Sequence, residues 1–418
     1  MARPLFQALP GTRDILAPDS QRMRALVEVF AEEAELAGFG QIVPPMFEDI
    51  GVFTRIGDST DIVTKELYDF EDNGGRRIAL RPEFTASVCR AYVQSRPVPP
   101  WKAWYAGPAF RQEKAQKGRY RQFDQVGAEV IGSHDPDLDT ELIAMAAGFY
   151  KRLGLTDVTL LVNTLGDKAD RPGYLDALRT YFGEHLDALS EQSRTTLAIN
   201  PLRVLDSKRP NDAEIVAGAP VLLDYISDDA AKAYGRVIDG LSTLSIPFVE
   251  APRLVRGLDY YTRTTFEFAS NALEAAQNAV GGGGRYDGLV ADLGGPEDPG
   301  VGFALGVDRT LLACDAEGVF GAVVPTPDLF VVATTEGTEA LALTQELRAE
   351  GWRVERAYDG RSMKAQMKAA NKSGAPVALI VGESEATDGT VSVRPMGEGD
   401  QVVVPRPELI PQLKELLP

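Results

Sequence analysis

The chain contains few of the residues from which many enzymes build nucleophilic or metal centres. Its 418 residues include two cysteines, Cys89 and Cys314, and two histidines, His134 and His185. Two cysteines are too few for a disulfide framework, and this usage is typical of a reducing compartment. So few histidines also argue against a His-rich metal site and against a Ser/His/Asp triad. We therefore expect a cytoplasmic protein without a resident metal site, whose chemistry depends on Arg, carboxylates, Tyr or a bound ion.

Long hydrophobic runs and an excess of positive charge are missing as well. The longest apolar stretches, such as Ala375–Val381, are far shorter than a membrane span, and Met1–Phe6 contain no apolar signal-peptide segment. The balance of 43 Lys and Arg against 61 Asp and Glu gives a net charge of -18. That charge argues against indiscriminate binding of polyanions but leaves room for a local basic patch. We expect a soluble protein with no membrane contact.

What the chain does contain is typical of a globular protein with more than one domain. Its length of 418 residues and its 44% hydrophobic content predict two or three domains with a sizeable core. Apolar residues recur at helical spacing over Gln21–Gly38. The following stretch, Gln41–Glu48, is predicted to be a strand whose two prolines place it at an edge or an interface. Further strands are predicted at Arg77–Leu80, Ala103–Ala106, Gln122–Val130, Val158–Val162, Thr264–Phe268 and Val301–Leu305.

These elements indicate an α+β fold class in which residues 1–325 form a large, mainly antiparallel sheet with helices packed on it. Residues from about 168 to 246 have a helical pattern, which predicts an inserted helical subdomain. Val323–Asp328 has the composition of a linker, and residues 326–418 alternate strands and helices like a βαβ domain. Its strands are predicted at Leu329–Ala333, Arg353–Ala357 and Val377–Val381, and its helices at Thr338–Glu350 and Ser362–Asn371.

The stretch Phe110–Phe123 is the most informative about chemistry, because two strand-like flanks enclose a basic loop with a glycine. Arg111 and Arg119 offer permanently charged forks that suit phosphate oxygens. Glu113 could accept a hydrogen bond from a base amino group, and Phe123 could stack on a nucleobase. A nucleotide is therefore a natural ligand. A solvated hairpin whose charges pair with one another accounts for the same residues equally well.

Gln125 and Glu129 follow Phe123 at even offsets, so in a strand they share its face and point into the same cleft. A buried carboxylate at this place requires a cationic or N–H-bearing partner. The alternative for Glu129 is an exposed position on an edge strand.

Three later segments could complete a ligand site. Arg256–Thr262 places one Arg and two Tyr before a strand, which could hold an anion or form an ordinary loop with packed tyrosines. Gly281–Gly288 lacks the spacing of a P-loop or a dinucleotide fingerprint. It indicates only that another group, such as a substrate, can approach the backbone closely here. Gly302–Arg309 is predicted to be a strand that opens into a helix. Arg309 would then be a second phosphate-binding guanidinium, at a helix N-terminus.

Taken in order, these segments resemble the class II aminoacyl-tRNA synthetases, and most closely the histidyl-tRNA synthetase family, over nearly the whole chain. Pro45 resembles the dimer-interface proline of the class, Phe110–Phe123 its second motif and Gly302–Arg309 its third. The histidine-specific resemblance rests on Leu254–Tyr261, Arg81–Thr85, Gly283–Asp287 and Asn200–Lys208. The resemblance implies ATP-dependent attachment of L-histidine to tRNA(His) through a histidyl-adenylate, with release of pyrophosphate and AMP, by a homodimer.

The resemblance also implies roles for single residues. Those expected to bind histidine are Glu83, Phe84, Thr85, Arg111, Gln125, Glu129, Arg256, Tyr260 and Tyr261, and those expected around ATP are Arg111, Glu113, Arg119, Phe123 and Arg309. Arg256 and Arg111 are the expected catalytic residues. The histidine carboxylate is already ionised, so its attack on the α-phosphorus needs alignment and charge neutralisation rather than a general base. Mg²⁺ is inferred from the reaction and not from a motif.

Four residues depart from what the family often has: Gln112, Ala115, Asp124 and Asp308. They leave the conformation of the loop open, and they do not affect the arginines.

In the last domain, Arg361, Lys364, Lys368 and Lys372 share one face of a predicted helix. By itself this pattern is typical of a solvated helix face. With the resemblance, the domain is similar to the anticodon-binding module of related synthetases, and Arg361, Lys364, Lys368 and the loop residue Gln116 are the expected tRNA contacts.

One rival function has the same catalytic domain. The regulatory subunit of ATP phosphoribosyltransferase, a non-catalytic paralogue in histidine biosynthesis, usually lacks the anticodon module and an intact Arg256–Tyr261 segment. Both features are present here, as are Arg111 and Arg309, which favours the ligase.

Overall fold

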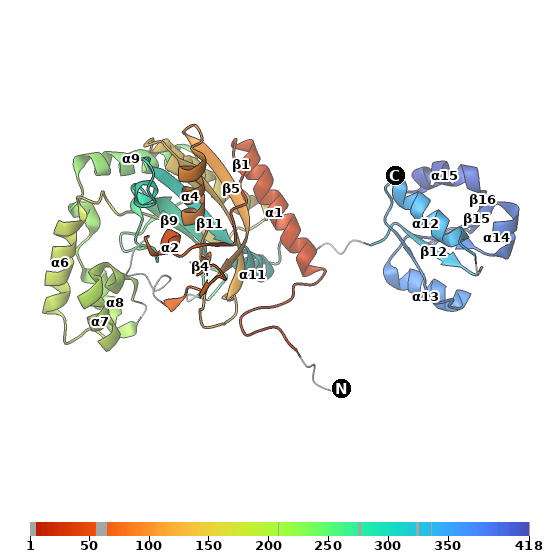
Figure 1. Ribbon diagram of the computed structural model, residues 1–418, viewed down its shortest axis with the longest axis horizontal. Coiled ribbons are helices and arrows are strands. Elements are labelled where there is room, and N and C mark those ends of the chain that lie inside the picture. Colours follow the sequence, from red (N-terminus) through yellow and green to blue (C-terminus); the bar gives the residue numbers. More distant parts are fainter. Residues whose placement is uncertain are drawn as a thin grey trace. The chain divides into compact units, whose positions relative to one another are not determined.

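The computed structural model describes residues 6–55, 65–207, 209–274, 277–322, 326–335 and 337–417. Within the predicted linker Val323–Asp328, the first three residues lie outside this description, as does Lys208 of the segment Asn200–Lys208. The chain divides into two compact units, Met1–Ala322 and Val323–Pro418 (Figure 1).

The first unit contains one large and one small sheet. Its strands are β1 (Gly40–Gln41), β2 (Phe47–Asp49), β3 (Asp69–Glu71), β4 (Arg77–Leu80), β5 (Trp101–Phe110), β6 (Gln122–Ile131), β7 (Val158–Thr164), β8 (Val249–Glu250), β9 (Thr262–Ser270), β10 (Ala279–Arg285) and β11 (Gly300–Gly306). Its helices are α1 (Asp19–Leu36), α2 (Gly51–Thr54), α4 (Thr85–Ser95), α5 (Asp137–Arg152), α6 (Arg171–Glu184), α7 (Glu191–Ile199), α8 (Pro210–Gly218), α9 (Asp228–Thr243), α10 (Leu289–Asp292) and α11 (Val307–Glu317), with 3-10 turns η1 (Pro201–Asp206) and η2 (Leu222–Asp224).

The large sheet has the order β1-β5-β6-β11-β10-β9-β7-β8. The inner strands β5, β6, β11, β10, β9 and β7 each pair antiparallel with their neighbours. The short strands β1 and β8 pair parallel at the two edges. The prediction of a mainly antiparallel sheet with helices packed on it is therefore confirmed. β-Branched and aromatic residues such as Val126, Phe266 and Phe303 fill the strand interiors, as the pleated surface favours.

Each face of this sheet is covered by helices. On one face α1, α5, α9 and α11 bury a shared cluster, in which Phe30 of α1 meets Phe149 of α5 edge to face at 5.4 Å. The helical spacing of Leu26, Phe30 and Ala34 explains why α1 forms there. The other cluster joins α4 and the helices α6 to α8 to Tyr260 and Tyr261. The tyrosines of the predicted ligand segment are thus held by the same core as the helical part of the chain.

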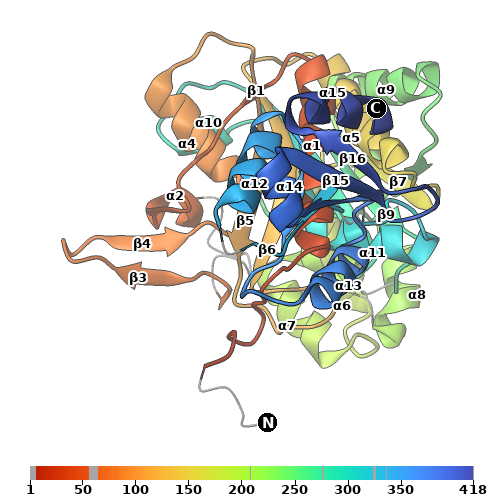
Figure 2. The ribbon, with the colours of Figure 1, turned by 90° about the vertical axis from the view of Figure 1, so that its right-hand side faces the viewer.

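The continuous strand predicted at Gln41–Glu48 is wrong. The chain pairs only at β1 and at β2, and residues 42–46 between them are irregular. Pro44 and Pro45 lack the N–H groups that a ladder needs, and each restricts the residue before it. The edge position is confirmed, because β1 is the first strand of the large sheet. Strand β2 belongs to the small sheet β2-β4-β3, whose β3 and β4 project from the unit in Figure 2.

Strand β10 was not expected, because Gly281–Gly284 suggested a close backbone approach and no regular element. It pairs with β9 on one side and β11 on the other. Both neighbours approach closely: a Cβ on Gly283 would lie 2.1 Å from the carbonyl oxygen of Gly302. Glycine is therefore required by the packing of the strand, although it has a low intrinsic preference for strands.

Arg285, from the family-like segment Gly283–Asp287, is a structural residue. Its side chain is 2% exposed and forms an ion pair with the buried Asp139. It also donates to the carbonyl oxygens of Ser133 and Asp135, both at 3.0 Å. These contacts tie the end of β10 to the loop before α5.

Replacing Arg285 with alanine should lower the free energy of unfolding by about 3–5 kcal/mol, because the Asp139 carboxylate would remain buried without a partner. Urea unfolding followed by circular dichroism measures the loss. The double variant Arg285→Met with Asp139→Leu is the control, and it should recover most of the stability because no charge is left buried. A single variant as stable as the wild type would contradict the structural role.

The second unit is a five-stranded sheet with helices on both faces. It contains β12 (Leu329–Ala333), α12 (Glu339–Ala349), β13 (Val354–Arg356), α13 (Met363–Ser373), β14 (Val377–Val381), α14 (Glu383–Asp388), β15 (Thr390–Pro395), β16 (Val402–Pro405), η3 (Arg406–Glu408) and α15 (Leu409–Leu416). The order is β13-β12-β14-β15-β16, with β13, β12 and β14 parallel and β15 and β16 antiparallel. The predicted βαβ elements are present, and the two antiparallel strands extend them. Within the described parts of the chain, no helix has the length and apolar character needed to cross a bilayer.

Candidate active site

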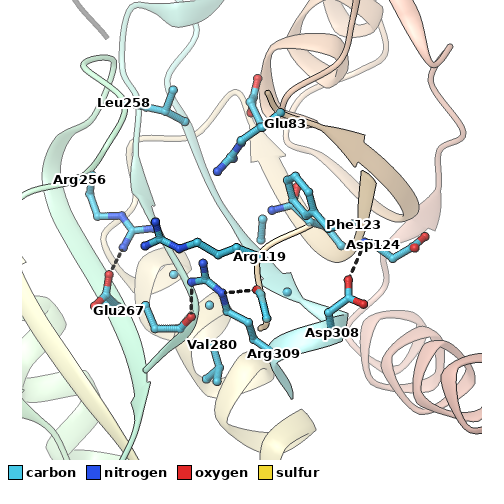
Figure 3. Close-up of a pocket in the computed structure, with 18 of the residues that line it drawn as sticks. Glu83, Arg119, Phe123, Asp124, Arg256, Leu258, Glu267, Val280, Asp308 and Arg309 are labelled. Atoms are coloured by element: carbon cyan, nitrogen blue, oxygen red, sulfur yellow. Dashed lines mark hydrogen bonds and ion pairs between the residues drawn. The ribbon is translucent and has the colours of Figure 1, made fainter. Parts of the chain in front are cut away.

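A pocket of about 190 Å³ opens in the first unit, between the β5–β6 loop, the start of α4, the segment before β9, strand β10 and the start of α11 (Figure 3). The sequence-predicted residues that line it are Glu83, Thr85, Arg111, Glu113, Arg119, Phe123, Gln125, Arg256, Tyr260, Tyr261 and Arg309.

Four guanidinium groups from three distant stretches reach this pocket. Arg111 and Arg119 belong to the β5–β6 hairpin, Arg256 precedes β9, and Arg309 lies in the first turn of α11. Figure 3 shows Arg119, Arg256 and Arg309 extending toward the same space. Such a cluster is suited to the oxygens of a polyphosphate.

Each arginine is held by a contact that fixes its direction. Arg256 pairs with Glu267 of β9, with Nη1 2.7 Å from Oε2. Arg309 donates to the carbonyl oxygens of Gly118 at 3.1 Å and Ala279 at 2.9 Å. Burial, together with the nearby positive charge of Arg119, lowers the pKa of Arg309. The pocket therefore concentrates positive charge that a bound anion would neutralise.

Arg111 lies between Pro82, which precedes Glu83, and the ring of Phe123. Its Nε donates to the carbonyl oxygen of Pro82 at 3.0 Å, and its guanidinium carbon lies 5.1 Å from the ring centre of Phe123. Glu113 lies between two arginines, with its oxygens 3.8 Å from Arg111 Nη1 and 3.5 Å from Arg119 Nη1. The charges of the hairpin therefore pair with one another, as the solvated-hairpin alternative expected, but Arg111, Glu113 and Phe123 also line the pocket.

The glycines of β10 make room for Arg256. A Cβ on Gly282 would lie 2.8 Å from both terminal nitrogens of Arg256, and 2.7 Å from the carbonyl oxygen of Phe266. The guanidinium therefore lies directly over the strand backbone. The sequence suggested a close approach to the backbone here, and the group that approaches it is this side chain.

The opposite end of the pocket is acidic and buried. Glu83 accepts hydrogen bonds from the backbone N–H groups of Thr85 at 2.7 Å and Ala86 at 2.9 Å, in the first turn of α4. Burial raises the pKa of Glu83 although both bonds oppose the shift. Thr85 and Tyr260, whose hydroxyl is 3.5 Å from Glu83 Oε2, complete this end.

Glu129 lies beneath Thr85 and is fully buried. It accepts hydrogen bonds from the hydroxyls of Thr85 at 2.7 Å, Tyr105 at 3.2 Å and Tyr286 at 2.8 Å. Burial raises its pKa to about 8, and the hydroxyl donors only partly oppose this shift. The exposed edge position is therefore wrong. A Cβ on Gly302 would lie 1.5 Å from Glu129 Oε2, so glycine is required beside it.

A second pair of carboxylates borders the pocket near α11. Asp308 accepts from the backbone N–H of Asp124 at 3.2 Å and forms an ion pair with Arg13 at 2.5 Å. Burial and the charge of Asp308 raise the pKa of Asp124 to about 6. Two of the four residues that depart from the family pattern are therefore neighbours.

Some predicted residues lie outside the pocket lining. Phe84 is buried between the guanidinium of Arg81, 3.9 Å from its ring centre, and the ring of Tyr105 stacked at 4.3 Å. Glu129 is separated from the pocket by Thr85. Gln116 is exposed in the β5–β6 loop, and Arg361, Lys364 and Lys368 belong to the second unit, where they are exposed on or just before α13.

Sequence reasoning did not identify several residues of the lining. Glu267, Leu258 and Val280 are the main ones, and they lie in or beside segments that the sequence had marked. The strand prediction at Thr264–Phe268 could have found Glu267, because it is the acidic residue of that strand. Among the described residues, no group of three or more His, Cys, Asp or Glu side chains is placed to hold a metal ion.

Comparison with known sequences agrees with this geometry. A family described as Histidyl-tRNA synthetase matches residues 11–310, and a second, described as Anticodon binding domain, matches residues 328–416. The chain belongs to the histidyl-tRNA synthetase family. It is 46% identical to a Histidine--tRNA ligase of Rhodococcus erythropolis, with 99% of this chain and 98% of that protein covered. A Histidine--tRNA ligase of Streptomyces coelicolor is also 46% identical, with both chains covered completely.

Solved structures of the same family have the same fold. Apo histidyl-tRNA synthetase of S. aureus superposes with a TM-score of 0.82 at 33% identity, covering 98% of this chain and 100% of that one. A chain from Bacillus halodurans, titled as an ATP phosphoribosyltransferase regulatory subunit/histidyl-tRNA synthetase, has a TM-score of 0.64 at 21% identity, covering 91% of this chain and 99% of that one. That second likeness concerns the fold alone. The full-length relatives therefore support the ligase more than the regulatory subunit.

Proposed function

We propose that the protein joins L-histidine to tRNA(His) in two steps, through a histidyl-adenylate made from ATP. The observation that carries the proposal is the single pocket in which Arg111, Arg119, Arg256 and Arg309 lie beside the buried carboxylate Glu83. The arginine side suits the triphosphate and the reacting carboxylate. The acidic side suits a cationic amino acid, because a buried carboxylate needs a cationic or hydrogen-bonding partner.

In the first step the side chains of the pocket align the two substrates and neutralise the negative charge of the phosphates. The carboxylate of histidine is the nucleophile and is ionised at neutral pH, so no general base is needed. Arg256 and Arg111 would hold the carboxylate and the α-phosphate, and Arg119 and Arg309 the remaining phosphates. Phe123 offers a face for the adenine ring. Pyrophosphate leaves, and a ribose hydroxyl at the end of the tRNA then attacks the adenylate and releases AMP.

Mg²⁺ would enter this site with ATP. The pocket fits such an ion because Glu113 and Glu267 contribute carboxylate oxygens beside the arginines, and Mg²⁺ is commonly held by one or two carboxylates together with substrate phosphates. When bound, it would neutralise phosphate charge.

The second unit is proposed to bind the anticodon region of the tRNA. Lys364, Lys368 and Lys372 are exposed along α13, while Gln366 and Ala370 on its other face are buried. Tyr358 nearby is 58% exposed, and the guanidinium carbon of Arg356 lies 4.7 Å from its ring centre. An exposed aromatic ring next to cationic groups is suited to an unstacked base and its phosphate.

A chain that ends at Ala322 should keep histidine-dependent exchange of pyrophosphate into ATP and lose tRNA charging by about 100-fold or more, the scale expected for removal of several phosphate and base contacts. The two activities are compared at equal enzyme concentration. The triple variant Lys364→Ala, Lys368→Ala and Lys372→Ala is the matched full-length control and should weaken charging alone. Unchanged charging by the shortened chain would reject the role of the second unit.

The protein is also proposed to act as a homodimer. Large apolar side chains are exposed around Pro45 and the small sheet, namely Val43, Met46, Phe47 and Phe70. Several large apolar side chains exposed close together are typical of a protein interface.

One assay tests the function as a whole. ATP–pyrophosphate exchange should be stimulated by L-histidine and by none of the other standard amino acids. Exchange with a different amino acid would reject the assigned substrate. Absence of exchange with any of them would support the regulatory subunit instead.

A further inference from the structure

The residues that bind the amino acid are carried by a segment without regular structure. Residues 251–261, which include Arg256, Tyr260 and Tyr261, form neither a helix nor a strand. Strand β7 holds one side of this segment, because Asn163 Nδ2 donates to the carbonyl oxygen of Leu254 at 2.9 Å. The other side faces the helical part of the chain, α6 to α8, and is held differently.

Three arginines join this segment to the helical part. Arg253 donates to the carbonyl oxygen of Ala217, near the end of α8, at 3.0 Å, and to that of Pro220, just after α8, at 2.5 Å. Arg203 of η1 forms an ion pair with Asp259 at 3.4 Å. Arg171, the first residue of α6, donates to the carbonyl oxygen of Tyr261.

Apolar packing holds only part of the segment on this side: Tyr260 and Tyr261 are buried in the cluster that they share with α6 to α8. A cavity of about 310 Å³ lies between the two parts, bordered by Leu175, Ile199 and Leu202 from the helical part and by Val255 and Leu258 from the segment. Apolar contacts across a space of this size are lost. The position of the segment therefore depends in part on the polar contacts at its two ends.

We infer that the helical part of the chain is a positioning scaffold for histidine recognition, acting through Arg171, Arg203 and Arg253. This inference rests on the proposed function. None of the three arginines lines the active-site pocket, and each acts through the backbone or a side chain of residues 253–261. It assigns a role to the family-like segment Asn200–Lys208: Arg203 holds Asp259, one residue from Tyr260, whose hydroxyl reaches toward Glu83.

A displaced segment should harm amino acid use more than nucleotide use. Arg256, Tyr260 and Tyr261 would move together, whereas Arg111, Arg119 and Phe123 belong to the β5–β6 hairpin and Arg309 to α11. A displacement of about 1 Å at a reacting group can cost about 100-fold in rate. We therefore expect the loss to appear in the KM for histidine and in kcat, with the KM for ATP unchanged.

The test measures ATP–pyrophosphate exchange by the full-length chain with Arg203→Gln, Arg253→Gln and Arg203→Lys. The two Gln variants should raise the KM for histidine by about tenfold or more and leave the KM for ATP within about twofold, while Arg203→Lys, which keeps the charge, should recover part of the loss. Arg179→Gln is the matched control, because Arg179 borders the same cavity, pairs with Asp176 and makes no contact with the segment among the contacts of the described residues. It should behave as the wild type.

Three outcomes would overturn the inference. Wild-type KM values for histidine in both Gln variants would remove the positioning role, as would equal losses for histidine and ATP. If Arg203→Gln did not fold, Asp259→Asn would replace it, because it removes the same ion pair, and a wild-type KM for histidine in that variant would be equally decisive. A wild type that showed no histidine exchange would instead reject the proposed function.

Discussion

Replacing Arg256 with alanine should abolish the formation of histidyl-adenylate. Arg256 is the arginine that lies on the same segment as Tyr260 and Tyr261 and also reaches the cluster of guanidinium groups (Figure 3). Its Nε is buried and has no hydrogen-bond partner among the described residues. A donor in this state is available to an anionic ligand, because leaving it unpaired is costly.

The expected loss in histidine-dependent exchange is at least about 1,000-fold, the upper end of what removing one donor to a developing charge costs. Arg256→Lys should recover little, because a single ammonium group cannot keep the ion pair with Glu267 and also offer a planar fork to the ligand. Steady-state exchange at saturating ATP measures both variants. Arg236→Ala, which removes a bidentate surface contact with Asp137, is the control and should be fully active.

Two results would contradict this role. Full exchange by Arg256→Ala would remove the residue from the chemistry. Loss of exchange together with a lowered melting temperature would attribute the effect to folding, because the variant leaves Glu267 without its 2.7 Å partner. A variant that melts like the wild type and does not react supports the proposal.

Part of the pocket could be predicted from the strand pattern of β6 and part from the residue types of the loops. Phe123 and Gln125 share one face of β6 and both line the pocket, as predicted, but Asp124 between them lines it too, so the alternation alone does not decide which residues reach it. The residue types of Phe110–Phe123 and Gly302–Arg309 indicated Arg111 and Arg309 as phosphate-binding groups, and the resemblance assigned both to one site, although no periodicity relates them to one another. Their convergence depends on the pairing of β6 with β11, which brings Gln125 opposite Gly306, three residues before Arg309.

Other features could not be read from the sequence because they depend on long-range pairing. Strand β10 is glycine-rich and gains its strand conformation from β9 and β11. Arg13 reaches Asp308, nearly three hundred residues away in the chain. The contacts of the helical part with residues 253–261 likewise join α6 and η1 to a distant loop. Local sequence patterns do not specify which distant residues pair in any of these contacts.

Glu129→Gln should reduce kcat/KM for histidine by about 100-fold and leave the KM for ATP unchanged. The scale is that of losing one partner of a buried charge pair. In the free protein three hydroxyls surround this carboxylate, and burial raises its pKa to about 8, so it is mostly protonated at pH 7. A cationic amino acid bound above Thr85 would favour the ionised form. Histidine binding at pH 7 should therefore release a proton, which calorimetry in buffers of different ionisation enthalpy measures.

The same shift predicts how stability depends on pH. The carboxyl binds a proton in the folded chain up to about pH 8, whereas in the unfolded chain it loses it near 4.5. Its contribution to stability is therefore complete below pH 4.5 and is lost as the pH rises through 8. Ligand-free Glu129→Gln has no such titration, so its melting temperature relative to the wild type should increase between pH 5 and pH 9.

Glu48→Gln is the matched control for these measurements. Glu48 is also buried, but it pairs with Arg90, whereas Glu129 accepts from Thr85, which lines the pocket. This variant should lose stability and keep the wild-type KM for histidine and the proton release on binding. If Glu129→Gln lost histidine and ATP use equally, or released the same proton on binding, Glu129 would be a structural residue of the core and not part of amino acid recognition.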